Sequence, residues 1–277
     1  MSYILYRILA TLSFFTRLPF WRLANVPKEC YERVVPLWPM TGWLTGSIMG
    51  FVYYICCRVF TVVGSPFLCV AFTFMSRVLI TGALHEDGFA DFCDGFGGSS
   101  SRERILEIMK DSRIGTYGVL SLIFYFLILL SVVSSIGHLY ECTYFVPSVL
   151  LVADVMCKAV SSTIIYSLPY ARNVSDAKNK LVYSNSTLGD KCATVILSLV
   201  PCSVLVLLVI PYMASALVFA FLMIIVARSL LVRYMRNRIH GYTGDCCGAM
   251  FVICECTFYI SVAIWPFVNK NVTELLT

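Results

Sequence analysis

The stretch CATVILSLVPCSVLVLLVIPYMASALVFAFLMIIVA, residues 192–227, contains no charged side chain in 36 residues. An α-helix needs about 20 apolar residues to cross the hydrocarbon core of a bilayer. The stretch is too long for one crossing, so it predicts a hairpin of two membrane helices that turns near Pro211. The whole chain has the same character, because 59% of its 277 residues are hydrophobic and 13% are charged. Roughly a quarter of residues are charged in soluble proteins, which excludes a soluble globular enzyme and a disordered chain.

Seven apolar stretches are long enough to cross a bilayer. They are Pro36–Cys57, Val59–Leu84, Ile114–Gly137, Tyr144–Leu168, Cys192–Ile210, Tyr212–Val232 and Cys246–Val268. Residues 3–20 carry Arg7 and Arg17 and predict an amphipathic helix at the membrane interface, with an eighth span as the alternative. The sequence therefore predicts an all-α polytopic integral membrane protein, with about seven transmembrane helices in one membrane-embedded domain over residues 1–277.

The basic residues give this arrangement an orientation. With the N-terminus inside, 17 of the 21 Lys and Arg residues fall in inside segments, and only Arg58 and Lys270 fall outside. Cytoplasmic loops carry such an excess of Lys and Arg. Topology therefore explains the net charge of +5, and we expect a lipid bilayer and no nucleic acid as partner.

The longest polar stretch begins with HEDGFADFCDG, residues 85–95. Asp87, Asp91 and Asp94 are spaced i, i+4 and i+7, which places them on one face of a helix. Three neighbouring carboxylates repel one another unless a cation lies between them, and Mg²⁺ prefers such oxygen ligands. The pattern therefore predicts a Mg²⁺ site, with a solvated charged face or a transporter gate as alternatives.

A second acidic segment follows a glycine-rich connection. Ser100 and Glu103 form a capping-box pattern, so a helix should begin near Ser101. On that helix Glu103, Glu107 and Asp111 would share one face, and basic side chains would occupy the others. Metal ions and basic side chains together stabilise phosphate groups during transfer. The two segments thus predict a site for a metal-bound diphosphate.

Two long motifs resemble one known family. Residues 81–95, TGALHEDGFADFCDG, and residues 104–118, RILEIMKDSRIGTYG, are similar to the hallmarks of cobalamin synthase, also called adenosylcobinamide-GDP ribazoletransferase. Shorter matches lie at residues 14–19, at residues 170–172, and at residues 243–249 with Glu255 beyond. The matches keep their order over nearly the whole chain.

The resemblance implies a reaction and a location. The family joins adenosylcobinamide-GDP to α-ribazole or α-ribazole 5′-phosphate, releases GMP, and forms adenosylcobalamin or its 5′-phosphate. It depends on Mg²⁺ and works in the bacterial inner membrane, here with the active site facing the cytoplasm. A CDP-alcohol phosphotransferase is the enzymatic alternative, but its longer aspartate motif is not matched. A transporter is the alternative of another class.

The resemblance also suggests residue roles. Asp87, Asp91 and Asp94 would hold the metal. Asp111 would be a further ligand or the base, with Glu107 orienting it. The remaining candidates are His85 as a second base, Asp245 as a catalytic residue from the far end of the chain, and Arg17, Arg104, Lys110 and Arg113 as substrate contacts.

Some further features of the sequence allow more than one interpretation. Any of the arginines could only anchor a helix at the interface, and Glu86 could be a ligand or a solvated side chain. Asp154 and Lys158 are one helical turn apart and predict an intramembrane ion pair. The glycines at 42, 46 and 50 predict a close helix contact, either within one chain, which we favour, or in a homo-oligomer.

Overall fold

The computed structural model describes residues 2–59, 66–140, 144–172, 187–209 and 214–276. Within these ranges the chain forms helices and a single isolated bridge between Tyr170 and Tyr242. The helices are α1 Tyr3–Phe15, α2 Lys28–Tyr31, α3 Trp38–Val59, α4 Pro66–Thr81, α5 Leu84–Gly98, α6 Arg102–Ile108, α7 Thr116–Leu139, α8 Phe145–Ser162, α9 Leu188–Val209, α10 Ala214–Ile239 and α11 Gly244–Leu276. The prediction of an all-α protein is confirmed.

The helices support a chain that crosses a membrane several times. Among the described residues, 5 helical segments are long and apolar enough to cross, or 6 if the bent pair α4 and α5 counts as one. The 5 segments are Val35–Val59, Thr116–Leu139, Phe145–Tyr166, Ala214–Ile239 and Gly244–Lys270. Each coincides with a predicted span. The predicted span Cys192–Ile210 coincides with α9, which is not among them, and the predicted turn near Pro211 lies outside the described residues.

The predicted span Val59–Leu84 differs from the structure, because it is not one straight crossing. Helix α4 ends at Thr81, and the chain turns by 90° before α5 begins. Gly82 and Ala83 both have left-handed backbone, with φ of 68° and 59°. Glycine adopts this conformation without cost. Sixteen residues of helix rise only about 24 Å, so α4 is too short to cross alone.

Helix α8 is buried along nearly its whole length and packs closely on α3. A Cβ added at Gly42 would lie 2.7 Å from the Val155 Cα, and one at Gly46 would lie 2.9 Å from the Leu151 Cα. The glycine stripe therefore lets two helices of the same chain approach, and the interpretation as a within-chain contact is confirmed. Because α8 covers the three glycines, this glycine stripe is not available as a contact surface between two copies of the chain.

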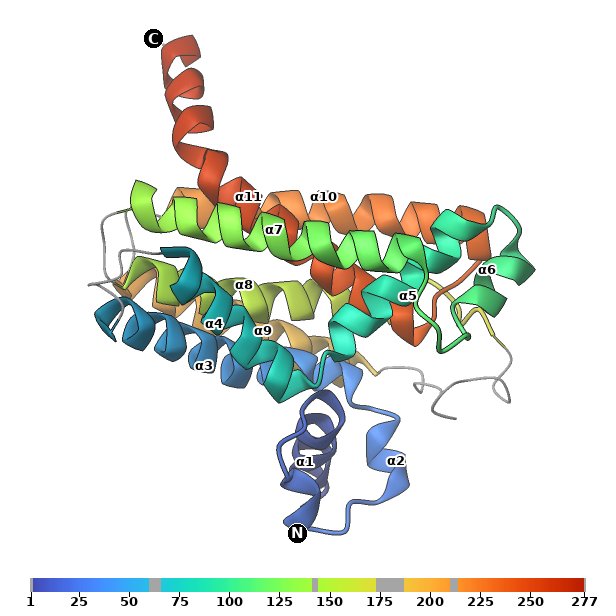
Figure 1. Cartoon of the computed structure of the whole chain (residues 1–277). Helices are drawn as coiled ribbons and strands as arrows, with labels where there is room; N and C mark the ends of the chain where they lie inside the picture. The colour runs from blue at the N-terminus through green and yellow to red at the C-terminus, as the bar shows by residue number, and fades with distance from the viewer. Residues whose placement is uncertain (1, 60–65, 141–143, 173–186, 210–213, 277) are drawn as a thin grey trace.

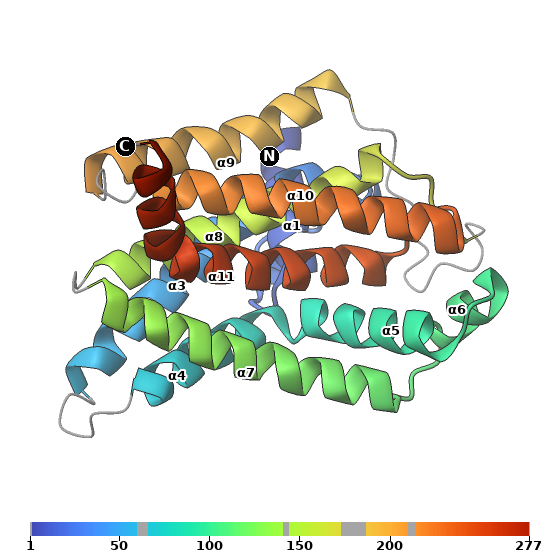
Figure 2. The ribbon, with the colours of Figure 1, turned by 90° about the horizontal axis from the view of Figure 1, so that it is seen from above.

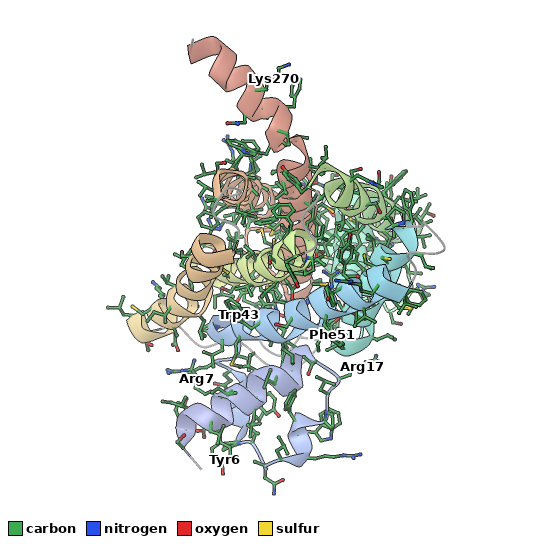
Figure 3. All side chains as sticks on the ribbon, turned by 90° about the vertical axis from the view of Figure 1, so that its left-hand side faces the viewer. Tyr6, Arg7, Arg17, Trp43, Phe51 and Lys270 are labelled. Atoms are coloured by element: carbon green, nitrogen blue, oxygen red, sulfur yellow. The ribbon has the colours of Figure 1, made fainter. Side chains whose placement is uncertain are left out.

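The N-terminal helix lies outside the bundle of long helices (Figure 1, and Figure 3 with Tyr6 and Arg7 labelled). Arg7 ties it to the bundle, because its guanidinium lies 2.7 Å from the Asp190 carboxylate at the start of α9. With 13 residues, α1 is too short to cross a bilayer, which argues against an eighth span. The predicted helix over residues 3–20 ends earlier than expected, at Phe15.

One end of the bundle gathers the segments that were predicted to be chemically active. Figure 1 shows α6 there, beside the C-terminal end of α5 and of α10. Viewed from above, α11 runs between α10 on one side and α5 and α7 on the other (Figure 2). This arrangement brings the first turns of α11, residues 244–249, against α5, which carries the first acidic motif.

Candidate active site

The acidic face of α5 forms as predicted, but its three aspartates have different surroundings. Asp87 is exposed, Asp91 is partly buried and Asp94 is buried. The two carboxylate oxygens of Asp94 accept hydrogen bonds from the backbone N–H groups of Gly115, at 2.7 Å, and Gly118, at 2.8 Å. These N–H groups begin α7, where the helix dipole favours a negative charge. Asp94 therefore joins α5 to the N-terminus of α7.

Helices α5 and α11 cross where each carries a glycine. A Cβ added at Gly88 would lie 3.1 Å from the Asp245 Cα, and one at Gly248 would lie 2.9 Å from the His85 carbonyl oxygen. No larger residue fits at Gly248 without a shift of the backbone. The crossing places Asp245, in the first turn of α11, against the residue that follows Asp87. The structure thus brings the motif at residues 243–249 against the acidic motif of α5.

Helix α6 begins as predicted and ends earlier than predicted. The helix begins near Ser101 as predicted, but the N-cap is Ser101, whose hydroxyl accepts a hydrogen bond from the Arg104 N–H at 3.4 Å, rather than Ser100 of the predicted capping box. The helix ends at Ile108, so Asp111 does not share a helical face with Glu103 and Glu107. This part of the prediction is wrong because the chain turns after Met109.

A surface pocket of about 370 Å³ lies between α5, α6 and α7. It is lined by Asp94, Gly98, Arg104, Glu107, Ile108, Asp111, Arg113, Gly115, Thr116 and Tyr117. Two ion pairs belong to it: Arg104 with Glu107 and Arg113 with Asp111, each at 2.7 Å. The pocket therefore contains five of the predicted site residues and the N-terminus of α7. The five residues are Asp94, Glu107, Asp111, Arg104 and Arg113.

The Asp111 carboxylate is held by its neighbour. Arg113 donates hydrogen bonds to it from both the backbone and the guanidinium, and these bonds lower the pKa of Asp111 to about 2. A carboxylate with so low a pKa is a poor proton acceptor near neutral pH. Of the two roles predicted for Asp111, the environment therefore favours binding a cation over acting as a base.

Two arginines that were not predicted as site residues hold the loops of the site together. Arg102 donates to the carbonyl oxygens of Ile239, at 3.0 Å, and Ala171, at 2.8 Å. Arg172 donates to the Leu106 carbonyl at 3.2 Å, and its guanidinium lies 3.9 Å from the Asp245 carboxylate. The short motif at residues 170–172 was the only sequence signal for this connection.

Several predicted residues lie elsewhere. His85 is buried between the rings of Trp38, at 5.4 Å, and Phe251, at 4.6 Å, rather than on the acidic face. Arg17 lies over Gly82 at the bend that begins α5. Lys110 is exposed and does not line the pocket.

Glu86 is neither a ligand nor a solvated side chain. It is 3% exposed, and its carboxylate lies 2.9 Å from the Arg77 guanidinium. Both interpretations of Glu86 from the sequence are therefore wrong, because the residue faces the interior of the bundle.

The donor chemistry suits a divalent cation, although the predicted ligands do not converge. Across the described ranges, no three His, Cys, Asp or Glu side chains are grouped so that they could hold a metal ion. The reason is that Asp94 is turned toward α7. Asp87 and Asp91 lie one turn apart on α5, and Asp245 packs against Gly88, the residue after Asp87. These are the hard oxygen donors that Mg²⁺ prefers.

Known proteins resemble the chain over most of its length. The sequence model described as cobalamin-5-phosphate synthase matches residues 7–263. The adenosylcobinamide-GDP ribazoletransferase of Shewanella amazonensis is 35% identical over 255 residues, which cover 91% of this chain and 92% of the relative. The enzymes of that name from Vibrio cholerae and Leptothrix cholodnii are 33% and 34% identical, covering 94% and 92% of this chain and 94% of each relative. No solved structure matches the chain. The chain belongs to the cobalamin-5-phosphate synthase family.

Proposed function

We propose that this chain is an adenosylcobinamide-GDP ribazoletransferase. It transfers the adenosylcobinamide-phosphate group to a ribose hydroxyl of α-ribazole or α-ribazole 5′-phosphate, with GMP as the second product. The observation that carries the proposal is the charged pocket of about 370 Å³ beside the acidic face of α5. The family and the names of the relatives support the same reaction. No feature of the site favours a CDP-alcohol phosphotransferase or a transporter.

The reaction exchanges one P–O bond for another. The ribose hydroxyl oxygen bonds to the phosphorus that carries the corrinoid arm, and the bond from that phosphorus to the GMP oxygen breaks. The hydroxyl proton passes to a base, and GMP leaves with the electron pair of the broken bond. The transition state gathers negative charge on the phosphoryl oxygens, which cationic groups stabilise.

The side chains of the pocket divide this work. Arg104 and Arg113 contact phosphate oxygens, because both are exposed and line the pocket. Glu107 is the carboxylate of the pocket that accepts the hydroxyl proton, since Arg113 makes Asp111 a weak base. Asp87, Asp91 and Asp245 carry the oxygen donors that would hold Mg²⁺, and to do so they would have to come closer together than in this structure, where the described residues form no metal-binding group of three. A bound Mg²⁺ would neutralise diphosphate charge.

The proposed location is the bacterial inner membrane, with the site on the cytoplasmic face. The support is the bias of the basic residues, since 17 of 21 fall in the segments predicted to be inside, and these include the site segments. A cytoplasmic opening also suits a charged nucleotide substrate, which does not enter hydrocarbon.

The test is a reconstituted reaction. Detergent-solubilised full-length protein is incubated with adenosylcobinamide-GDP, α-ribazole and Mg²⁺, and GMP and the cobalamin product are separated by chromatography. We expect both products in equal amounts, none after chelation of the metal, and recovery when Mg²⁺ is restored. CDP-diacylglycerol with an alcohol serves as the control substrate pair. Folded protein that forms no GMP, or that turns over the control pair instead, would contradict the proposal.

A further inference from the structure

The buried charges inside the bundle pair with one another. Arg77 of α4 forms ion pairs with Glu86 of α5, at 2.9 Å, and with Glu255 of α11. Lys158 and Asp154 of α8 form the predicted intramembrane pair, at 2.6 Å, and both are fully buried. Each of these charges has its partner within the protein, whereas the pocket between α5, α6 and α7 is open at the surface.

The pocket has an aromatic side chain that the proposed chemistry does not use. Tyr117, in the first turn of α7, lines the pocket and is 56% exposed. It is the one aromatic side chain among the described residues that line the pocket. An exposed ring has apolar faces, and covering them with another flat group is favourable. Tyr117 is therefore a position at which a flat ligand can bind.

A glycine orients the Tyr117 ring. A Cβ added at Gly97, near the end of α5, would lie 2.7 Å from Cγ, 2.8 Å from Cδ1 and 3.0 Å from Cδ2 of the tyrosine. Three adjacent ring atoms at nearly equal distances mean that one face of the ring lies on the backbone of α5, where no Cβ intervenes. The exposed part of the ring is therefore turned away from α5.

Ile108 extends this apolar surface. Its Cδ1 atom would lie 3.2 Å from a Cβ added at Gly98, the last residue of α5. Ile108 and Tyr117 both line the pocket, so they flank the last turn of α5 from α6 and from α7. The pocket thus has an apolar part beside α5 and a charged part that carries Arg104 and Arg113.

The charged part alone gives a diphosphate only limited net attraction. Arg104 pairs with Glu107, and Arg113 pairs with Asp111, each at 2.7 Å. Asp94 also lines the pocket, so three carboxylates accompany the two guanidinium groups. A diphosphate meets anionic neighbours as well as the arginines, and like charges oppose its binding. Tight binding therefore needs a contribution from an uncharged part of the substrate.

We infer that Tyr117 is a substrate-binding residue whose ring stacks on the guanine base of the nucleotide substrate, while Arg104 and Arg113 contact the diphosphate. The inference rests on the proposed function, which places a guanine nucleotide in this pocket. Bases stack on aromatic side chains through their flat faces. Guanine is favoured over the aromatic base of α-ribazole, because guanine is covalently joined to the diphosphate that the two arginines contact.

Binding titrations separate the base from the phosphates. GDP and pyrophosphate are titrated calorimetrically into the detergent-solubilised full-length protein, and thermal unfolding is recorded for each variant. We expect Tyr117→Leu to weaken GDP binding by about tenfold and to change pyrophosphate binding by less than about twofold, because only GDP has a base. Tyr117→Phe keeps the ring and should retain the affinity of the wild type for GDP.

Steady-state kinetics separate the two substrates. In Tyr117→Leu the KM for adenosylcobinamide-GDP should rise about tenfold with kcat unchanged, because the stack is present in both the ground state and the transition state. The KM for α-ribazole should not change. Tyr234 of α10 provides the matched control, since it is 40% exposed and does not line the pocket. Tyr234→Leu should change neither GDP affinity nor either KM.

The possible outcomes are distinct. Unchanged GDP affinity in Tyr117→Leu, an equal loss of GDP and pyrophosphate affinity, or an equal loss in Tyr117→Phe would each overturn the stacking role. So would a wild-type protein that forms cobalamin and binds no GDP. A rise in the KM for α-ribazole alone would overturn the assignment to guanine.

A second variant covers the case in which Tyr117→Leu does not fold. Gly97→Ala keeps the ring but displaces it, because the added methyl group cannot fit beneath it. It should weaken GDP binding and spare pyrophosphate binding, and unchanged GDP affinity would overturn the inference. A wild-type protein that binds GDP through Tyr117 and forms no cobalamin product would contradict the proposed function while leaving the stacking role intact.

Discussion

The ion pairs of the pocket and those inside the bundle use the same residue types for opposite purposes. Arg104 and Glu107 are 60% and 68% exposed in their side chains, whereas Arg77 and Glu255 are both 0% exposed. Water screens the exposed pair, which therefore contributes little to stability. Without water, each buried charge depends on its partner. The exposed pairs can exchange their partners for a substrate, and the buried ones cannot.

In this protein the exposed charges line the pocket, and the buried charges hold helices together. The charged residues of the pocket lie on α6 and in the segment before α7, and they are open to water, so that a phosphate can replace one partner of each pair. The buried charges lie among apolar rings, including Phe74 and Phe251. Three changes test whether exposed and buried charges differ in this way, and the largest effect is expected in the interior.

Removal of the buried cation should cost the most. Arg77→Met leaves Glu86 and Glu255 without their counter-charge, and we expect the free energy of unfolding to fall by about 3–5 kcal/mol. Thermal or denaturant unfolding in detergent measures the loss. Replacing the whole neighbouring pair with Asp154→Leu and Lys158→Met should cost far less, because no charge stays unpaired. An Arg77→Met protein as stable as the wild type would show that the interior is not organised by charge.

A change in the pocket should affect catalysis and leave stability alone. We expect Glu107→Gln to lower kcat/KM by about 100-fold, since it removes the proposed proton acceptor, with no change in the temperature of unfolding. Glu103 provides the matched control, because it lies on the same helix with 80% of its side chain exposed and does not line the pocket. Glu103→Gln should keep full activity, and an equal loss in both variants would remove the special role of Glu107.

The smallest effect is expected from pH. Arg113 lowers the pKa of Asp111 to about 2, so this carboxylate favours the folded state above its unfolded pKa of about 3.9. That contribution is lost only as the pH falls toward about 2. Asp111 therefore stays ionised from about pH 5 to about pH 9, and Arg113→Gln should leave the acid limb of the kcat/KM profile in place. If the acid limb of the kcat/KM profile shifts between about pH 5 and about pH 9 in Arg113→Gln, Asp111 is the base that titrates.

The sequence predicted most elements of the fold because apolar runs and caps are local signals. The long helices, the start of α6 near Ser101 and the common face of Asp87 and Asp91 all follow from spacing alone. The bend at Gly82 was missed, since an apolar run looks the same whether it is straight or broken. The end of α6 before Asp111 was missed because polar segments lack a periodic apolar face.

The amino-acid sequence by itself determined that the chain is a membrane protein rich in long apolar helices, and which family motifs it carries. Only the tertiary structure decided what each charge does. Asp94 caps α7, Glu86 pairs with Arg77, and Asp245 lies against Gly88, although all three stand in similar acidic contexts in the sequence. The physical reason is that the state of a carboxylate depends on the donors and cations within a few ångströms, and helices distant in the sequence supply them.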